Sequence, residues 1–135
     1  MSGQSDRVCM CALDGTMDLL GKKWVLFTIN AIANHGSARF KELYGELGGI
    51  SPSTLSSILR SLESRGLVSR EPFAEIPPRV EYRLTGNGVG LREAILPLLA
   101  WASEQDGYAE RAEKCDPRQY VRVALPGTGG QGPNG

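Results

Sequence analysis

The sequence predicts an α+β, mostly helical domain, and three observations between residues 39 and 85 support this fold class. Apolar residues recur at helical spacing on both sides of the glycine pair Gly48-Gly49, so two short helices flank a tight turn. Ser51 and Pro52 form a helix start, because serine is a good N-cap and proline fits the first helical position. Two strand-like runs, 67–70 and 80–84, then flank a proline-rich loop. Helix, turn, helix and β-ribbon in this order are typical of a winged helix-turn-helix.

The two helices of this motif cover about 41–47 and 51–65. In the second, Leu55, Leu59 and Leu62 share one face, and serines occupy much of the rest. Serine has a modest helix propensity, so packing on a small core must hold this helix in place. The strands of the ribbon flank Pro77-Pro78, since proline cannot donate a hydrogen bond within a ladder. The wing loop is therefore expected at 73–78.

The elements before the motif are a short helix at 16–20 and a strongly apolar segment at 24–32. The apolar residues of 24–32 surround most of a helical wheel, so we expect a helix buried on most sides. Gly36 is a suitable left-handed cap for its end. Residues 38–40 are expected to add a minimal strand to the ribbon, which gives a two- to three-stranded wing.

A last long helix follows the ribbon. Thr85 is expected to cap it, with the helix beginning near Asn87 and ending or breaking near Cys115. Pro97 lies inside the apolar pattern and should kink or divide the helix. The apolar side of this helix, from Leu91 to Trp101, is large for a helix at the edge of a domain and indicates an interface.

The length of 135 residues is that of one domain with tails. We expect residues 1–8 to be disordered, the winged helix-turn-helix with its dimerisation helices to cover 9–112, and an extension to cover 113–135, flexible from about 126. No apolar run approaches the roughly 20 residues of a membrane span. The first residues are polar and lack the hydrophobic region of a signal peptide. We therefore expect no membrane partner and a cytoplasmic location.

Charge and composition exclude some classes of function. The chain has 15 basic and 15 acidic residues, so a global basic signature of nucleic-acid binding is missing. Residues 22–83, however, hold nine basic and six acidic side chains, which permits contacts to phosphate. Three cysteines and one histidine do not have the spacing of a disulfide framework or a zinc site. No pattern resembles a catalytic set, so we expect no metal, no cofactor and no enzymatic activity.

The helix that starts at Ser51 is the candidate recognition helix. Its N-terminal half would meet base edges through Ser53, Thr54 and Ser57, whose hydroxyls also bind phosphate. Arg60 lies further along and is expected to meet phosphate. The alternative is a solvated helix face, and the surrounding turn and ribbon favour DNA.

In the wing, Arg79 is the candidate for a DNA contact, because it lies at the returning base of a loop stiffened by two prolines. The alternative is an arginine paired with Glu75 or Glu81. Arg39, at the start of the helix-turn-helix, and the pair Lys22-Lys23 could each touch phosphate, although such residues are more often plain surface charges.

Several motifs resemble the HxlR family of transcriptional regulators, relatives of MarR-type winged-helix proteins. The matching positions are Cys11, 20–24, 39–43, 50–51, 55–56, 62–63, 66–70, 77–82, 84–85, Gly88, Leu91 and Trp101. The resemblance implies a homodimer on double-stranded DNA with a pseudo-palindromic operator, and an interface formed by the N-terminal segment and the last long helix. The complete set of DNA-contacting residues that we expect is Arg39, Ser51, Ser53, Thr54, Ser56, Ser57, Arg60 and Arg79.

The chain departs from the family pattern at a few positions. Lys22 replaces a usual glycine, and Ala12 replaces a common proline. Ser53 and Ile58 occupy recognition-helix positions that are often basic in relatives, so we expect weaker dependence on salt and a different operator.

The resemblance also makes Cys11 a candidate redox sensor, because part of the family uses a cysteine at this position to sense oxidants or electrophiles. The alternative is a half-buried interface cysteine. A disulfide between Cys9 and Cys11 would close a strained ring, so a disulfide between subunits is the preferred expectation.

Two further interpretations stay open. The fold could serve protein contacts without specific DNA binding, which the zero net charge and the serine-rich helix favour. A small-molecule effector could also bind near the dimer interface, in a pocket lined by Trp24, Phe27 and Trp101, although such aromatics are more often plain core.

Overall fold

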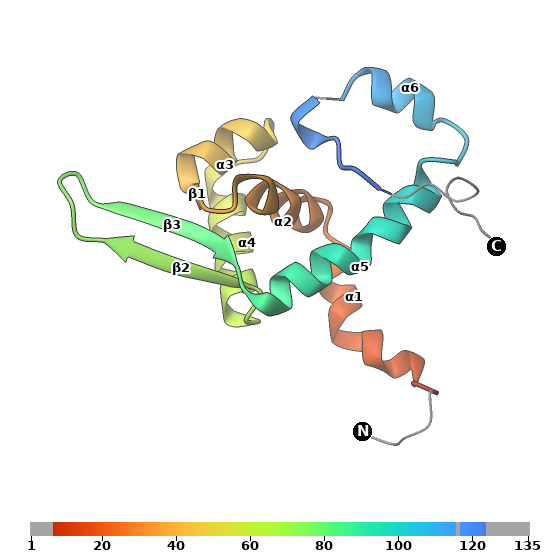
Figure 1. Ribbon diagram of the computed structural model, residues 1–135, viewed down its shortest axis with the longest axis horizontal. Helices are drawn as coiled ribbons and strands as arrows, with labels where there is room; N and C mark the ends of the chain where they lie inside the picture. The colour runs from red at the N-terminus through yellow and green to blue at the C-terminus, as the bar shows by residue number, and fades with distance from the viewer. Residues whose placement is uncertain (1–6, 116, 124–135) are drawn as a thin grey trace.

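The computed structural model describes residues 7–115 and 117–123, and it confirms the winged helix-turn-helix (Figure 1). The elements are η1 (Met10–Leu13), α1 (Asp14–Leu20), α2 (Lys23–His35), β1 (Ala38–Arg39), α3 (Phe40–Leu47), α4 (Pro52–Ser64), β2 (Val68–Phe73), β3 (Arg79–Leu84), α5 (Gly86–Ala102), α6 (Tyr108–Glu113) and η2 (Pro117–Gln119). The expected disorder at 1–8 falls outside the described residues except at Arg7 and Val8, and the expected flexibility from 126 falls outside them entirely.

Helix α2 forms the centre of the core, as its apolar sequence predicts. Val25, Ile29 and Ile32 are buried on it, and they pack in one cluster with the apolar faces of α3 and α4. Gly36 ends the helix with φ of 75°, a conformation that favours glycine, and its N–H donates to the carbonyl of Ile32. The buried helix predicted at 24–32 is therefore confirmed and extends to His35.

The turn between α3 and α4 has the geometry that its residues predict. Gly48 and Gly49 have φ of 32° and 96°, so the chain reverses at two residues without side chains. Ser51 then caps α4, since its Oγ accepts a hydrogen bond of 3.1 Å from the N–H of Thr54. Pro52 occupies the first helical position, where a missing N–H costs nothing.

The sheet has three antiparallel strands in the order β1-β3-β2. Strands β2 and β3 pair from Val68↔Leu84 to Phe73↔Arg79, and β1 adds Ala38↔Tyr82 beyond β3. The long β2–β3 ribbon projects from the helices as the wing, and its loop at 74–78 forms the tip (Figure 1).

Helix α5 begins in a close contact with the loop after α4. The Thr85 hydroxyl accepts from the Gly88 N–H at 3.1 Å and donates to the Gly66 carbonyl at 2.6 Å, which confirms the predicted cap. A Cβ placed on Gly88 would lie 2.0 Å from the Leu67 carbonyl oxygen. The glycine at this position is what allows the helix to lie so close to the chain that precedes the ribbon.

The C-terminal part corrects one expectation. Helix α5 passes through Pro97 and ends at Ala102, so it is neither divided at the proline nor continued to Cys115. Gly107, with φ of 87°, starts the separate helix α6 after a short turn. The segment that follows contacts the end of α2 at η2, where the Asn34 side-chain amide donates to the Arg118 carbonyl at 3.3 Å. Among the described helices, none has the length and apolar character needed to cross a membrane.

Candidate nucleic-acid interface

Helix α4 has one apolar and one hydroxyl-rich face. Leu55, Ile58, Leu59 and Leu62 are buried against the core. The predicted contact residues Ser51, Ser53, Thr54, Ser57 and Arg60 are exposed, and Ser56 is half-buried. The serine-rich helix is therefore held by packing and leaves its hydroxyl groups open to a ligand, as the sequence predicts.

The hydroxyl groups at the start of α4 are linked to one another. Ser51 Oγ donates to Thr54 Oγ1 at 2.8 Å and lies 3.3 Å from Ser53 Oγ. Because the Thr54 hydroxyl accepts this bond through its oxygen, its hydrogen is available for a further hydrogen bond. Thr54 can therefore donate to a base edge or a phosphate oxygen.

Two lysines lie beside these hydroxyl groups, a position that their spacing along the chain does not predict. A surface hollow of about 370 Å³ is lined by Lys22 and Lys23 on one side and by Ser53, Thr54 and Ser57 on the other. Trp24 also lines it, and the ammonium group of Lys23 lies 4.7 Å from the centroid of the indole ring. Ammonium and hydroxyl groups around one hollow suit the phosphate oxygens of a nucleic-acid backbone.

Arg39 has a structural role at the start of α3. Its backbone N–H donates to Glu42 Oε1 at 2.8 Å, which fixes the first turn, and its side chain is exposed. It faces Glu81 across the sheet. Arg39 is thus on the surface of the helix-turn-helix, as expected.

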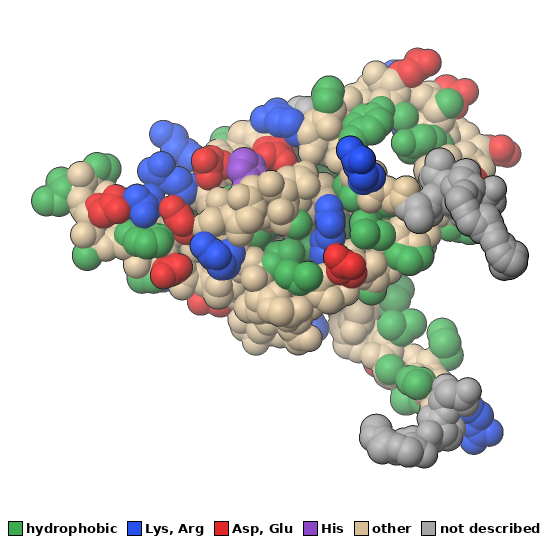
Figure 2. Space-filling model, viewed as in Figure 1, with side chains coloured by type: hydrophobic (Ala, Val, Ile, Leu, Met, Phe, Trp, Pro, Cys, Tyr) green, Lys and Arg blue, Asp and Glu red, His purple; other side chains and the backbone are tan. Residues whose placement is uncertain are grey.

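Arg79 pairs with Glu75 and Glu81, which was the alternative to a contact with DNA. Its Nη1 donates to Glu75 Oε1 at 2.8 Å, and its Nε lies 3.0 Å from Glu81 Oε2. The guanidinium also covers the Phe73 ring, with Cζ 4.2 Å from the ring centroid. Both carboxylates that the sequence offered as partners are therefore used. Figure 2 shows acidic and basic side chains side by side on the part of the surface where the ribbon projects.

Glu81 is itself anchored at the base of the wing. The Ser37 hydroxyl donates to Glu81 Oε1 at 2.7 Å. This hydrogen bond is the main reason why the pKa of Glu81 lies below its ordinary value of 4.5. The positive charges of nearby arginines, Arg79 first among them, lower it further. The carboxylate is therefore ionised at neutral pH, and it joins the loop before β1 to strand β3.

The three aromatics expected to line an effector pocket do not come together. Trp24 and Phe27 make an edge-to-face contact on α2, with ring centroids 5.7 Å apart. Trp101 lies on α5 with 58% of its surface exposed and lines neither hollow described in this section. A larger hollow of about 900 Å³ between α2, α5 and the C-terminal segment is lined by Phe27 but by neither tryptophan.

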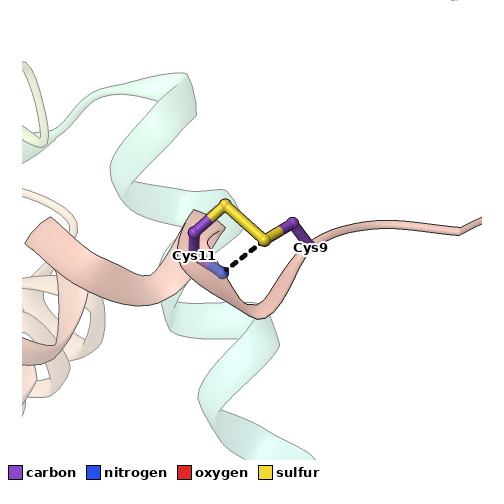
Figure 3. Close-up of a disulfide and its surroundings, with 2 residues drawn as sticks. All are labelled: Cys9 and Cys11. Atoms are coloured by element: carbon purple, nitrogen blue, oxygen red, sulfur yellow. Dashed lines mark hydrogen bonds between the residues drawn. A yellow bond between two sulfur atoms is a disulfide. The ribbon is translucent and has the colours of Figure 1, made fainter.

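The cysteines also differ from expectation. The structure joins Cys9 and Cys11 in a disulfide within one chain, and the Cys11 N–H donates to Cys9 Sγ at 3.1 Å (Figure 3). The local pair, a less favoured alternative to a disulfide between subunits, is therefore the one that this structure contains. The third cysteine, Cys115, lies in the C-terminal segment and is half-buried. No group of three metal-ligating side chains occurs within 7–115 and 117–123.

Comparison with known proteins places this geometry in a family. The model of the HxlR-like helix-turn-helix family matches residues 19–110. An HTH-type transcriptional regulator of Halalkalibacterium halodurans is 41% identical over 86 residues, which are 64% of this chain and 76% of the relative. The HTH-type transcriptional regulator YvaP of Bacillus subtilis is 36% identical over 96 residues, which are 70% of this chain and 88% of the relative.

Solved structures share the fold. A MarR-family transcriptional regulator from Enterococcus faecalis superposes with a TM-score of 0.67 at 32% identity, over 84% of this chain and 100% of its own. The reduced form of the transcriptional regulator YodB from B. subtilis gives 0.66 at 31% identity, over 75% of this chain and 97% of its own. The chain therefore belongs to the HxlR-like helix-turn-helix family of transcriptional regulators, DNA-binding proteins and not enzymes.

Proposed function

We propose that the chain binds a pseudo-palindromic operator as a homodimer and regulates transcription from it in the cytoplasm. The observation that carries this proposal is the hollow where Lys22 and Lys23 meet the exposed hydroxyl groups of α4. A twofold dimer would present two copies of α4 about 34 Å apart, one DNA turn, so that both enter the major groove.

The proposed contacts fall into two groups. Ser53, Thr54 and Ser57 meet base edges, with Ser51 and Ser56 at the same end of the helix. Lys22, Lys23, Arg39 and Arg60 meet phosphates and fix the position of the helix. Because hydroxyl groups discriminate poorly among bases, much of the selectivity would come from the shape of the DNA. Arg79 belongs to the wing, where its ion pairs direct it toward Glu75 and Glu81.

The dimer is proposed to form through α1 and α5. Leu98 and Trp101 leave 54% and 58% of their surfaces exposed on α5, and Met10 and Met17 are exposed near the N-terminus. Helix α1 extends away from the rest of the domain (Figure 1), which leaves these side chains open to a second copy. Apolar side chains left exposed on two elements are typical of a subunit interface.

The test is fluorescence anisotropy on a duplex from upstream of the gene, against a scrambled duplex, at two salt concentrations. We expect tighter binding to the first duplex and weakening as salt rises. The double variant Lys22→Ala, Lys23→Ala should reduce the slope of log K against log salt by about 3.6, because the proposed dimer loses four phosphate contacts, two in each subunit, and each contributes about 0.9. Lys114→Ala, a matched exposed lysine on the far C-terminal segment, should leave the slope unchanged.

Equal or absent binding to both duplexes would contradict the proposal for this operator. A wild-type slope in the double lysine variant would contradict the assignment of the phosphate contacts. If no upstream duplex binds, the protein-interaction function moves ahead, because zero net charge and a serine-rich helix suit a protein partner equally well.

A second function, redox response, is favoured by the bonded pair Cys9 and Cys11. Structural relatives at about one third identity include the redox regulator HypR in its oxidized form and diamide-treated YodB. We propose that the two thiols lose two protons and two electrons to an oxidant such as diamide and form the disulfide, which changes the N-terminal part of the dimer interface. Reduction by a dithiol would reverse the step.

This response is tested by DNA affinity before and after diamide. We expect a change in the wild type, its loss in Cys11→Ser, and a normal response in the matched control Cys115→Ser. Cys9→Ser separates the two pairings: loss of the response supports the pair within one chain. A retained response with a disulfide-linked dimer on a non-reducing gel would restore pairing between subunits. Unaltered affinity of oxidised wild type would remove the sensor proposal.

A small-molecule effector is a further part of the proposal, and the larger hollow between α2, α5 and the C-terminal segment is the place for it. Phe27 is the predicted aromatic that lines this hollow. A change in DNA affinity on adding a compound, lost in Phe27→Ala with normal basal binding, would support it.

A further inference from the structure

The wing tip of this protein carries an exposed apolar side chain. Ile76 is fully exposed, more so than any other large hydrophobic residue within the described parts of the chain. It lies in the loop at 74–78 beside Pro77 and Pro78, and Figure 2 shows hydrophobic side chains gathered at this end of the molecule. Isoleucine at the end of a projecting ribbon adds nothing to the core.

The positive charge of Arg79, just behind the wing tip, is already paired with two carboxylates. Arg79 is held between Glu75 and Glu81 and stacks on Phe73. A guanidinium with two carboxylate partners is a poor phosphate ligand, because it must first give up those partners. The tip therefore offers an apolar contact in place of a positive charge.

We propose that Ile76 enters the minor groove of the operator as an apolar wedge, and that Arg79 is a positioning residue that holds the wing in shape. This inference rests on the proposed DNA-binding function. The ribbon packs beside α4 and has six-residue strands, which reach about 20 Å from their base. A wing of this length beside a helix in the major groove reaches the neighbouring minor groove.

The minor groove is the partner that fits such a tip. Isoleucine and proline side chains are used by other proteins to enter minor grooves and partly unstack a base step. G·C pairs place the guanine amino group in the minor groove, and an apolar side chain cannot accept its hydrogen bond. A·T pairs lack this group. The wing should therefore favour A·T pairs and contribute little to the dependence on salt.

The experiment measures binding of full-length wild type and Ile76→Ala to the upstream duplex that the wild type binds. Hydroxyl-radical footprinting first identifies the minor-groove positions protected by wild type but not by Ile76→Ala. We expect about a tenfold loss of affinity per wing, since several apolar carbons lose their contact, with an unchanged salt slope. Val89→Ala, a control that trims another exposed aliphatic side chain, should bind like the wild type.

The second arm replaces A·T pairs at the identified positions. Inosine·C pairs present the minor groove of A·T but the major groove of G·C, so wild type should tolerate them and lose affinity with G·C. Arg79→Ala should lose this preference at an unchanged salt slope, and Arg79→Lys, which keeps a cation between the two glutamates, should restore it. A phosphate contact by Arg79 in each subunit of the dimer would instead lower the slope by about two in the alanine variant.

The outcomes separate the two proposals. Wild type that binds no upstream duplex overturns the proposed function. The wing proposal alone is overturned if the wild type binds its duplex and Ile76→Ala binds equally well, with the same footprint and the same response to inosine·C and G·C. A drop in slope with Arg79→Ala would also overturn it, since the tip would then act through charge.

Discussion

Replacing Gly88 by alanine should destabilise the fold, although most glycine-to-alanine changes in a helix do the opposite. The added Cβ would lie 2.0 Å from the Leu67 carbonyl oxygen and 3.3 Å from the Leu84 Cβ. Non-bonded carbon and oxygen atoms approach to about 3.3 Å. The start of α5 would therefore have to move away from the chain before β2 by more than about 1 Å.

The size of the effect follows from three contributions. Overpacking of this kind costs about 1–3 kcal/mol. A displaced helix start also weakens the Thr85 cap and its bond to Gly66, which is worth about 1 kcal/mol. Alanine returns up to about 1 kcal/mol through its higher helix propensity. We expect a net loss of about 1–3 kcal/mol in the free energy of unfolding.

Urea denaturation followed by circular dichroism, at one fixed protein concentration, measures this loss. Gly90→Ala is the matched control, since it lies two residues further along the same helix and a Cβ there meets nothing within 4 Å. Gly90→Ala should be as stable as the wild type or more stable. If Gly88→Ala were also as stable as the wild type, the close contact between α5 and Leu67 would not exist in solution.

Three further predictions concern other parts of the fold. Ser51→Ala should lower stability by about 1 kcal/mol in the same urea assay, because it removes the cap of α4; an unchanged midpoint would contradict that cap. The ionised Glu81, whose pKa is lowered in the folded state, stabilises the fold fully above pH 4.5, and this contribution should be lost as pH falls through the lower folded value. Glu81→Gln and Ser37→Ala should therefore each reduce the loss of thermal stability in acid. A pH profile identical to that of the wild type would contradict this role of Glu81. Leu98→Glu with Trp101→Glu should shift sedimentation from dimer to monomer, and a persisting dimer would exclude that face of α5.

The elements of the fold were predictable because local chemistry determines them. Helical spacing gave α2 and α4, Ser51 and Pro52 gave the start of α4, and the proline pair limited the strands to its two sides. The break after Ala102 was missed, although the apolar pattern stops there and the polar run 103–106 leads to Gly107.

Features that depend on contacts between distant residues were not predictable in the same way. Gly88 looked like part of a loose helix start, and only the folded structure shows the carbonyl of Leu67 against it. The sequence named both partners of Arg79 but could not decide between DNA and the carboxylates. Lys22 and Lys23 looked like ordinary surface charges, because their nearness to α4 depends on how α2 packs.

The stacking of Lys23 on Trp24 gives the protein an optical reporter at its proposed DNA-binding face. The chain has two tryptophans. Trp24 lines the hollow beside α4, and Trp101 lies exposed on α5. A phosphate that draws the ammonium group off the indole would change the emission of Trp24, and a second subunit over α5 would change that of Trp101. With Trp101→Phe and Trp24→Phe as single-tryptophan variants, intrinsic fluorescence would follow operator binding and subunit association separately, without any added label.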